Sequence, residues 1–161
     1  MLNNDFKALI NQLLVLNFLD YILTGLNSFE NDTVAVTGPL IYTDVSKFTN
    51  LATKIFYIFA MIINNLGAVF VQGGNCIIKK KYLDNVNGYD TSIAFYGEDT
   101  MTARRLKQFG KIKFNRNLFI YSSPRRLKSQ GLLNTTILYL VNYLYVTLKN
   151  KSFSNDYKDH R

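Results

Sequence analysis

Apolar residues recur along this chain at two spacings, and each spacing predicts a type of element. Between residues 5 and 28 they return every three or four positions, as on one face of an α-helix, and Gly25 near the end of this stretch is a typical stop signal. The same spacing predicts a second helix over residues 47–64 and a long amphipathic helix within 129–148. The apolar sides of these two helices are formed by Phe48, Leu51, Ala52, Ile55, Phe59, Ile62 and Ile63 in the first and by Leu133, Ile137, Leu140, Val141, Leu144 and Leu148 in the second.

Short β-branched or apolar runs between these helices predict strands. Residues 33–37, TVAVT, are typical of a buried strand, and the Gly-Pro pair that follows directs the chain out of the sheet. Residues 76–78, 111–115 and 118–121 suit three further short strands. Three consecutive lysines at 79–81 are expected to form a basic turn.

Helices and strands therefore alternate, which predicts an α/β layer fold. A further helix is expected over residues 100–109, with Gly110 as its stop. Only about four short strands are predicted and none lies in the first thirty residues, so the pattern is that of part of a larger sheet. We expect a single α/β domain over residues 1–151, followed by a flexible polar tail at 152–161.

The composition indicates a folded chain and narrows the chemistry. Of the 161 residues, 48% are hydrophobic and 19% charged, which is enough for a real core. The single cysteine, Cys76, excludes an internal disulfide, and the single histidine, His160, argues against a histidine-based triad or zinc site. These facts favour a reducing, cytoplasmic setting. The chain does not begin with a signal-peptide pattern, and the apolar run at 55–63 is well short of the roughly 20 residues that span a membrane.

The net charge of +8 is concentrated in the second half of the chain. From Lys79 onward there are 16 Lys and Arg against 6 Asp and Glu, whereas the first 78 residues have 3 against 5. Such a field suits phosphate-bearing ligands, an anionic membrane surface or nucleic acid, although scattered lysines are as often simply solvated. Nucleic acid is the weakest of these interpretations, because the aromatic residues follow core-like periods instead of alternating with cations. The uncharged stretch 129–148 could lie on an anionic leaflet, because it is flanked by Arg125, Arg126, Lys128, Lys149 and Lys151.

Two adjacent acids, Glu98 and Asp99, follow Gly97 and open a predicted helix. The residues three and four positions further on are not cationic, so neither acid has the usual ion-pair partner on its own helix. One interpretation is that Asp99 is an N-cap and Glu98 is solvated. The other is that a carboxylate at this position acts as a general base toward a substrate hydroxyl. The local sequence leaves both open.

A series of short motifs resembles one enzyme family. Residues 34–149 are similar to the acceptor-side half of a family-2 type inverting glycosyltransferase, a group that uses nucleotide-sugars and has a GT-A type fold. The matching motifs, in order, are VAVTGP (34–39), FVQGGNCIIKKKYLDNVNGYD (70–90), YGEDT (96–100), RRLKQFGKI (104–112) and YSSPRR (121–126). The resemblance implies sugar transfer to an acceptor hydroxyl with inversion, in polysaccharide or glycolipid synthesis.

The resemblance also assigns roles to particular residues. It implies that Asp99 is the base that deprotonates the acceptor, and that Glu98 binds the acceptor or orients the base. The remaining residues implied to bind substrate are Gly73, Gly74 and Asn75 beside the donor sugar, Gly97 in the motif of the two acids, and Arg125 and Arg126 near the donor diphosphate or the acceptor. The alternatives are a plain tight turn at the glycines and a basic turn near a membrane at the arginines.

One part of the family pattern is missing. The family holds a divalent cation, Mg²⁺ or Mn²⁺, with an Asp-x-Asp motif in its nucleotide-binding half, and no Asp-x-Asp occurs in this sequence. We therefore expect no metal ligands here, and either a fragment of a longer or split gene, whose donor-binding N-terminal half comes from elsewhere, or a degenerate relative of the family. In both cases the chain is expected to be inactive alone. The expected location is cytoplasmic, peripheral on the inner face of the membrane. The alternative function is a non-catalytic module that binds a membrane surface or another protein.

Overall fold

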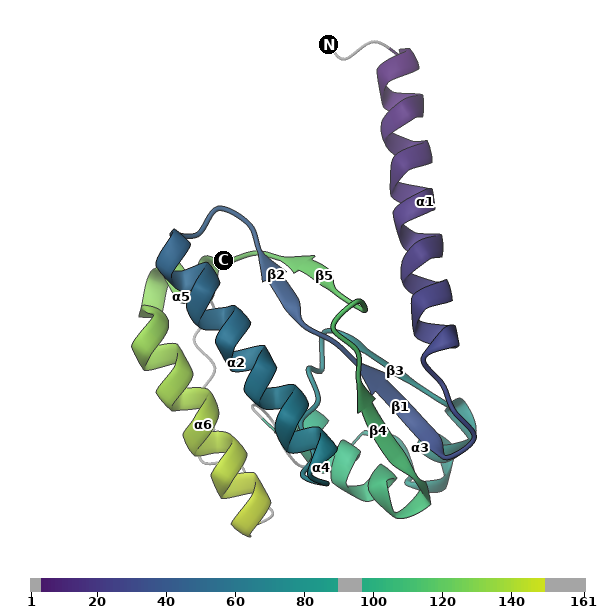
Figure 1. Cartoon of the computed structure of the whole chain (residues 1–161), viewed down its shortest axis with the longest axis vertical. Helices are drawn as coiled ribbons and strands as arrows, with labels where there is room; N and C mark the ends of the chain where they lie inside the picture. The colour runs from purple at the N-terminus through teal and green to yellow at the C-terminus, as the bar shows by residue number, and fades with distance from the viewer. Residues whose placement is uncertain (1–3, 90–96, 150–161) are drawn as a thin grey trace.

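The computed structural model describes residues 4–89 and 97–149, and for residues 4–15 it describes the backbone alone. Segment 90–96, with Asp90 and Tyr96 of the motifs, lies outside the described residues. The same is true of the tail predicted at 152–161, with Lys151 just before it. The described chain is a mixed α/β structure with two small sheets and helices on both sides of them (Figure 1). The predicted α/β class is confirmed.

The larger sheet is built around β1 (Thr33–Thr37), whose five residues are all buried. On one side β1 pairs antiparallel with β3 (Cys76–Ile78), and on the other it pairs parallel with β4 (Lys111–Phe114). A second sheet consists of β2 (Leu40–Tyr42) and β5 (Ile120–Ser122) in parallel. Five strands thus replace the four predicted, because β2 is only three residues long and shows no alternation.

Gly38 marks the passage from one sheet to the next. A Cβ atom at this position would lie 1.8 Å from the carbonyl oxygen of Leu118, so no residue with a side chain fits without moving backbone. The chain leaves the first sheet here, as the sequence predicts, and continues directly into β2. The close contact joins the loop after β4 to the loop after β1.

Four helices were predicted, and each is present with small changes of boundary, whereas the short helices over residues 80–85 and 125–130 were not predicted. The helices are α1 (Asn4–Asn27), α2 (Lys47–Asn65), α3 (Lys80–Asn85), α4 (Glu98–Leu106), which continues as a 3₁₀ turn over Lys107–Phe109, α5 (Arg125–Gln130) and α6 (Leu132–Lys149). One prediction was wrong in detail, because the lysines at 79–81 belong to the start of α3 instead of a turn. Gly131, with φ +78°, separates the short α5 from α6.

Helices α2 and α6 turn their apolar sides away from the sheets. On α2 the buried residues are Tyr57 and Ala60, whereas Phe59 is 61% exposed. On α6 the buried residues include Thr135 and Asn142, whose side chains bond back to carbonyls of their own helix. Figure 1 shows the two helices running in the same direction on the same side of the molecule.

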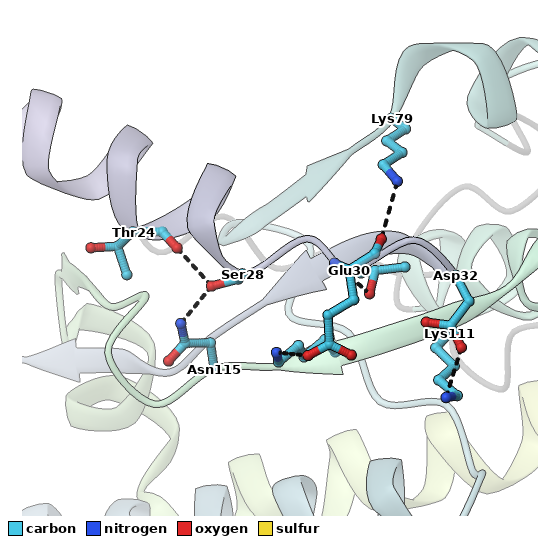
Figure 2. A network of polar contacts seen from close by, with 9 residues as sticks. Thr24, Ser28, Glu30, Asp32, Lys79, Lys111 and Asn115 are labelled. Carbon is cyan, nitrogen blue, oxygen red and sulfur yellow. Dashed lines mark hydrogen bonds and ion pairs between the residues drawn. The ribbon is translucent and has the colours of Figure 1, made fainter.

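Helix α1 extends away from the two sheets and is attached at its C-terminal end (Figure 1). There Gly25 is buried so close to β3 that a Cβ atom would lie 2.2 Å from the Ile77 side chain. Ser28 donates to the Thr24 carbonyl and accepts from the Asn115 amide, which ties the helix end to the loop after β4 (Figure 2).

Ion pairs continue this attachment along the edge of the sheet. Glu30 pairs with Lys113 and Asp32 with Lys111, both on β4, and Lys79 donates to the Glu30 carbonyl oxygen at 3.5 Å (Figure 2). The Lys111 ammonium lowers the pKa of Asp32 through their hydrogen bond. These pairs are exposed, so they set the position of the turn before β1 more than they stabilise the fold.

Candidate functional site

Asp99 and Gly73 meet although 26 residues separate them in the sequence. The Asp99 carboxylate accepts the Gly73 N–H at Oδ2 (3.0 Å) and the Thr100 N–H at Oδ1 (2.7 Å). A Cβ atom at Gly73 would lie 2.9 Å from that Oδ2 and 3.0 Å from the Asp99 Cβ. The glycine therefore allows the loop after residue 70 to approach the carboxylate closely.

The loop that carries Gly73 is fixed to the end of β1. The Thr37 hydroxyl accepts the N–H of Gln72 at 3.0 Å and donates to the carbonyl of Asn75 at 2.8 Å. Both ends of the Gly-Gly pair are thus bound to one buried strand residue. Gly74 itself has open space around it, because no atom lies within 4 Å of the position that a Cβ would take there.

Helix α4 places Asp99 and starts at a glycine for a steric reason. Gly97 is the N-cap residue with φ +127°, a backbone conformation that strongly favours glycine, and a Cβ atom there would lie 2.5 Å from Val146 on α6. Asp99 is the second residue of the helix, so the strict N-cap interpretation is wrong. The carboxylate nevertheless satisfies one of the free N–H groups of the first helical turn, that of Thr100.

Asp99 borders a small cavity between α4, β1 and β3. The cavity has a volume of about 10 Å³, close to the least that holds one water molecule. It is lined by Ala35, Val71, Gly73, Cys76, Ile78, Tyr89, Asp99, Thr102, Ala103 and Leu106. Within the described residues, the buried Thr102 hydroxyl has no hydrogen-bond partner. A buried polar atom of this kind is a natural binding point for a water molecule or a ligand group.

The cavity changes the acidity of the groups around it. Burial raises the pKa of Asp99, and the hydrogen bonds from Thr100 and Gly73 oppose that rise without cancelling it. Burial, with the nearby Asp99 charge, raises the pKa of the Cys76 thiol to about 12. Burial also raises the pKa of Tyr89, and the charges of Cys76, Glu98 and Asp99 add to the effect. Deprotonation of Asp99 therefore carries a desolvation cost.

A carboxylate in this state can accept a proton. Its raised pKa makes it a stronger base than an exposed aspartate, and it keeps acceptor positions beyond the two N–H groups it binds. Glu98, one residue earlier, is exposed. It lies beside Tyr89, whose pKa it affects.

Asn75 is buried and its side chain is engaged within the protein. Its amide nitrogen donates to the carbonyls of Pro39 (3.0 Å) and Leu118 (2.7 Å), and its oxygen accepts the Tyr21 hydroxyl (2.8 Å). These contacts join α1, both sheets and the glycine loop. The predicted role of Asn75 beside a donor sugar stays a prediction, with both amide protons already used inside the fold.

The two arginines of the motif lie on α5, at the far end of α6 from Asp99. The Arg126 guanidinium donates to the Tyr139 hydroxyl at 2.6 Å, whereas Gly97 lies against Val146, seven residues and about 10 Å further along the same helix. Arg125 is exposed on α5. Figure 1 shows α5 and α4 at opposite ends of α6. The structure thus brings together Gly73, Gly97, Glu98 and Asp99 and leaves Arg125 and Arg126 apart from them.

The described part of the chain does not provide ligands for the divalent cation that the resemblance implies. In residues 4–89 and 97–149 no three His, Cys, Asp or Glu side chains gather into a group that could hold a metal ion. In the same residues no helix is both long enough and apolar enough to cross a membrane.

Three residues of this site were not singled out from the sequence. Cys76, Tyr89 and Thr102 line the cavity with Asp99. Tyr89 follows the turn glycine Gly88 and stands within the FVQGGN…NGYD motif, which is the signal that could have identified it. Thr102 gives no such signal, because a threonine inside a helix is ordinary until its burial is known.

In comparisons with known proteins, no family model, no curated protein and no solved structure matched this chain. The glycosyltransferase resemblance therefore depends on its ordered motifs.

Proposed function

We propose that this chain is the acceptor-side half of an inverting glycosyltransferase of GT-A type, in which Asp99 is the catalytic base. The observation that carries the proposal is the Asp99 carboxylate itself. It is largely desolvated, has a raised pKa, is held by the Gly73 N–H at 3.0 Å, and borders a cavity with a second polar group, Thr102. Two of the ordered motifs, the one that contains Gly73 and the one that contains Asp99, meet at this carboxylate.

In the proposed reaction, Asp99 accepts the proton of an acceptor hydroxyl while the hydroxyl oxygen bonds to the anomeric carbon of a nucleotide-sugar. The bond between that carbon and the diphosphate oxygen breaks, and the nucleoside diphosphate leaves with the electron pair, which inverts the anomeric centre. Glu98 is exposed next to the base and is assigned to acceptor binding. Gly73, Gly74, Asn75 and Gly97 are assigned to substrate binding, and Arg125 and Arg126 to a more distant anionic part of donor or acceptor.

Donor binding requires groups that the described residues do not provide. These residues contain no group of carboxylates that could hold Mg²⁺ or Mn²⁺, so the proposed reaction assigns them no role in cation binding. We propose that a nucleotide-binding half, supplied by other polypeptide, completes the site. Cytoplasmic donors and a saccharide or lipid-linked acceptor fit this arrangement.

The decisive variant is Asp99→Asn in the complete enzyme, with the nucleotide-binding half present, assayed as acceptor-dependent release of nucleoside diphosphate from UDP- and GDP-hexoses with Mg²⁺ or Mn²⁺ added. Because positioned general bases contribute about 10²–10⁴ in rate, we expect a loss of that size. The matched control is Asp84→Asn, which removes an exposed acid paired with Lys80 on α3 and is expected to leave the rate unchanged.

A binding measurement separates an incomplete enzyme from a wrong assignment. Saturation-transfer NMR with saccharide acceptors should detect binding even if donor-binding polypeptide is lacking. An acceptor that binds but receives no sugar supports the acceptor-side assignment. A chain that binds no donor and no acceptor contradicts the proposal, as does an Asp99→Asn variant with wild-type rate.

A further inference from the structure

The outward sides of α2 and α6 form an apolar surface that the fold leaves uncovered. We name it the α2–α6 face and define it by its exposed members: Phe48, Leu51, Ile55, Ile58, Phe59, Ile62, Leu66, Leu133, Ile137, Leu140, Leu144 and Leu148. Several are exposed to an extreme degree, with Phe48 at 74% and Leu148 at 76%. Rows of exposed apolar side chains on two neighbouring helices mark a contact with something other than water.

The orientation of both helices shows that this exposure is systematic. On α2 the exposed residues Leu51, Ile55 and Ile62 repeat at intervals of four and seven, so they lie in one row, while Tyr57 and Ala60 face the sheets. On α6 the row of Leu133, Ile137, Leu140, Leu144 and Leu148 is exposed in the same way. Most large apolar residues of the two helices thus face outward, and the buried residues are Tyr57 and Ala60 on α2 and Thr135, Asn142 and Val146 on α6.

Charge indicates what covers the face. Neither α2, α5 nor α6 contains an acidic residue, and the sequence has no Asp or Glu from Thr100 to Asn155. The cations on these helices are Lys47, Lys54, Arg125, Arg126, Lys128 and Lys149. Apolar rows on helices that carry cations and no acids are the pattern of helices that lie in the plane of an anionic bilayer surface. An acid close to these cations, Asp44 in the loop before α2, pairs with Lys128.

The cations are concentrated at one end of the face. Lys128 pairs with Asp44, three residues before Lys47, so α5 lies beside the start of α2. Figure 1 shows α5 and the first turns of α2 and α6 gathered at this end. Lys47 and Arg125 are both exposed there. The α2–α6 face thus has cations gathered at one end, and apolar side chains along the rest of the two helices.

We propose that the α2–α6 face binds peripherally to a membrane surface that contains anionic lipid, with the basic end at the headgroups and the apolar rows in the outer acyl region. The site of Asp99 plays no part in this contact, so the proposal stands or falls independently of glycosyl transfer. If transfer is also correct, the same contact would hold the acceptor site near lipid-linked acceptors.

Vesicle binding tests the proposal directly. The full chain is sedimented with vesicles of phosphatidylglycerol and phosphatidylcholine in equal parts, and with vesicles of phosphatidylcholine alone. We expect binding to the first and little to the second, weakened by added salt because part of the attraction is electrostatic. The double variant Leu51→Ser/Phe59→Ser should lower partitioning by about tenfold or more, since each removes a large apolar side chain from the contact. Leu23→Ser, at a leucine of similar exposure on α1, is the matched control and should bind like the wild type.

Charge variants complete the test. Lys47→Glu/Arg125→Glu should abolish the preference for anionic vesicles, whereas Lys80→Glu, at an exposed lysine on α3, should retain it. The chain has no tryptophan, so Phe59→Trp supplies a single reporter, whose emission should shift to the blue on anionic vesicles. The emission of the Leu23→Trp variant, with its tryptophan on α1, should not shift.

Two results would overturn the proposal. The first is absence of binding to anionic vesicles, or binding that the α2–α6 variants leave unchanged. The second is self-association: if sedimentation equilibrium shows a dimer that Leu51→Ser/Phe59→Ser converts to monomer, the face is covered by a second copy of the chain and not by lipid.

Discussion

At the scale of single residues, the two glycines of the Gly-Gly pair differ completely in what surrounds them. Gly73 lies against the Asp99 carboxylate, whereas Gly74 has open space on the side where a side chain would project. The sequence presents them as equivalent. Only the packing of the loop against α4 separates a glycine that is required from one that is tolerated.

This difference gives a matched pair of variants. In Gly73→Ala the new methyl group would meet Asp99 Oδ2 at 2.9 Å and must displace the carboxylate, so in the complete enzyme we expect a loss of transfer of up to about 10²-fold, the effect of a misplacement near 1 Å. Gly74→Ala should leave the rate within about twofold. Thermal denaturation of both variants checks that the fold is intact. Equal effects of the two substitutions would show that the contact between Gly73 and Asp99 is not used.

The raised pKa of Asp99 predicts how stability depends on pH. Because the pKa in the folded protein is above the value in the unfolded chain, the protonated carboxyl contributes stability that is complete below about pH 4 and is lost as pH rises through the folded pKa. The melting temperature of the wild type minus that of Asp99→Asn should therefore fall between pH 3 and pH 7. Exposed acids such as Asp32 cancel in this difference, since both proteins contain them. A difference that grows with pH would mean that the hydrogen bonds from Gly73 and Thr100 outweigh burial.

At the scale of elements, Asn75 is the residue that joins the most parts of the fold. It connects α1 through Tyr21, the turn between the sheets through Pro39, and the loop before β5 through Leu118. A side chain that bonds three separate segments can stabilise all three against separation.

Asn75→Ala should therefore destabilise the protein by at least about 2 kcal/mol, because buried carbonyls left without partners cost about 1–3 kcal/mol each. Tyr21→Phe removes only the bond to the amide oxygen and should cost about 0.5–1.5 kcal/mol. Urea denaturation followed by circular dichroism measures both. If the two variants lose the same stability, the amide donors to Pro39 and Leu118 do not contribute.

The helices also show where sequence patterns stop being informative. Hydrophobic spacing predicted α1, α2 and α6 to within about two residues at most of their ends, because the period of an α-helix is fixed by its geometry. The same spacing does not show whether the apolar side of a helix faces the sheets or the outside. It identifies an apolar side, and on α2 and α6 that side faces outward, which depends on what the sheets accept as neighbours.

At the scale of the whole molecule, the strand runs and the α/β class were predictable, and the pairing was not. β1 and β3 were identified residue for residue, but the parallel partner of β1 is β4, and no local pattern indicates that choice. The same limit applies to the candidate site, whose segments were predictable and whose contacts were not. Asp99 and the glycine loop were found from motifs, while their contact, and the participation of Cys76, Tyr89 and Thr102, depend on how α4 packs on β1.

The parallel pairing of β1 with β4 has a consequence for how the chain is made. The pair joins Thr33 to Lys111, so β1 leaves the ribosome long before its neighbour has been synthesised. Until then one edge of a strand made of five apolar or threonine residues stays open to other chains. Such long-range pairings also form slowly. The nascent protein is therefore most prone to aggregation in the interval between the synthesis of β1 and that of β4, which makes chaperone binding during translation most valuable over residues 38–110.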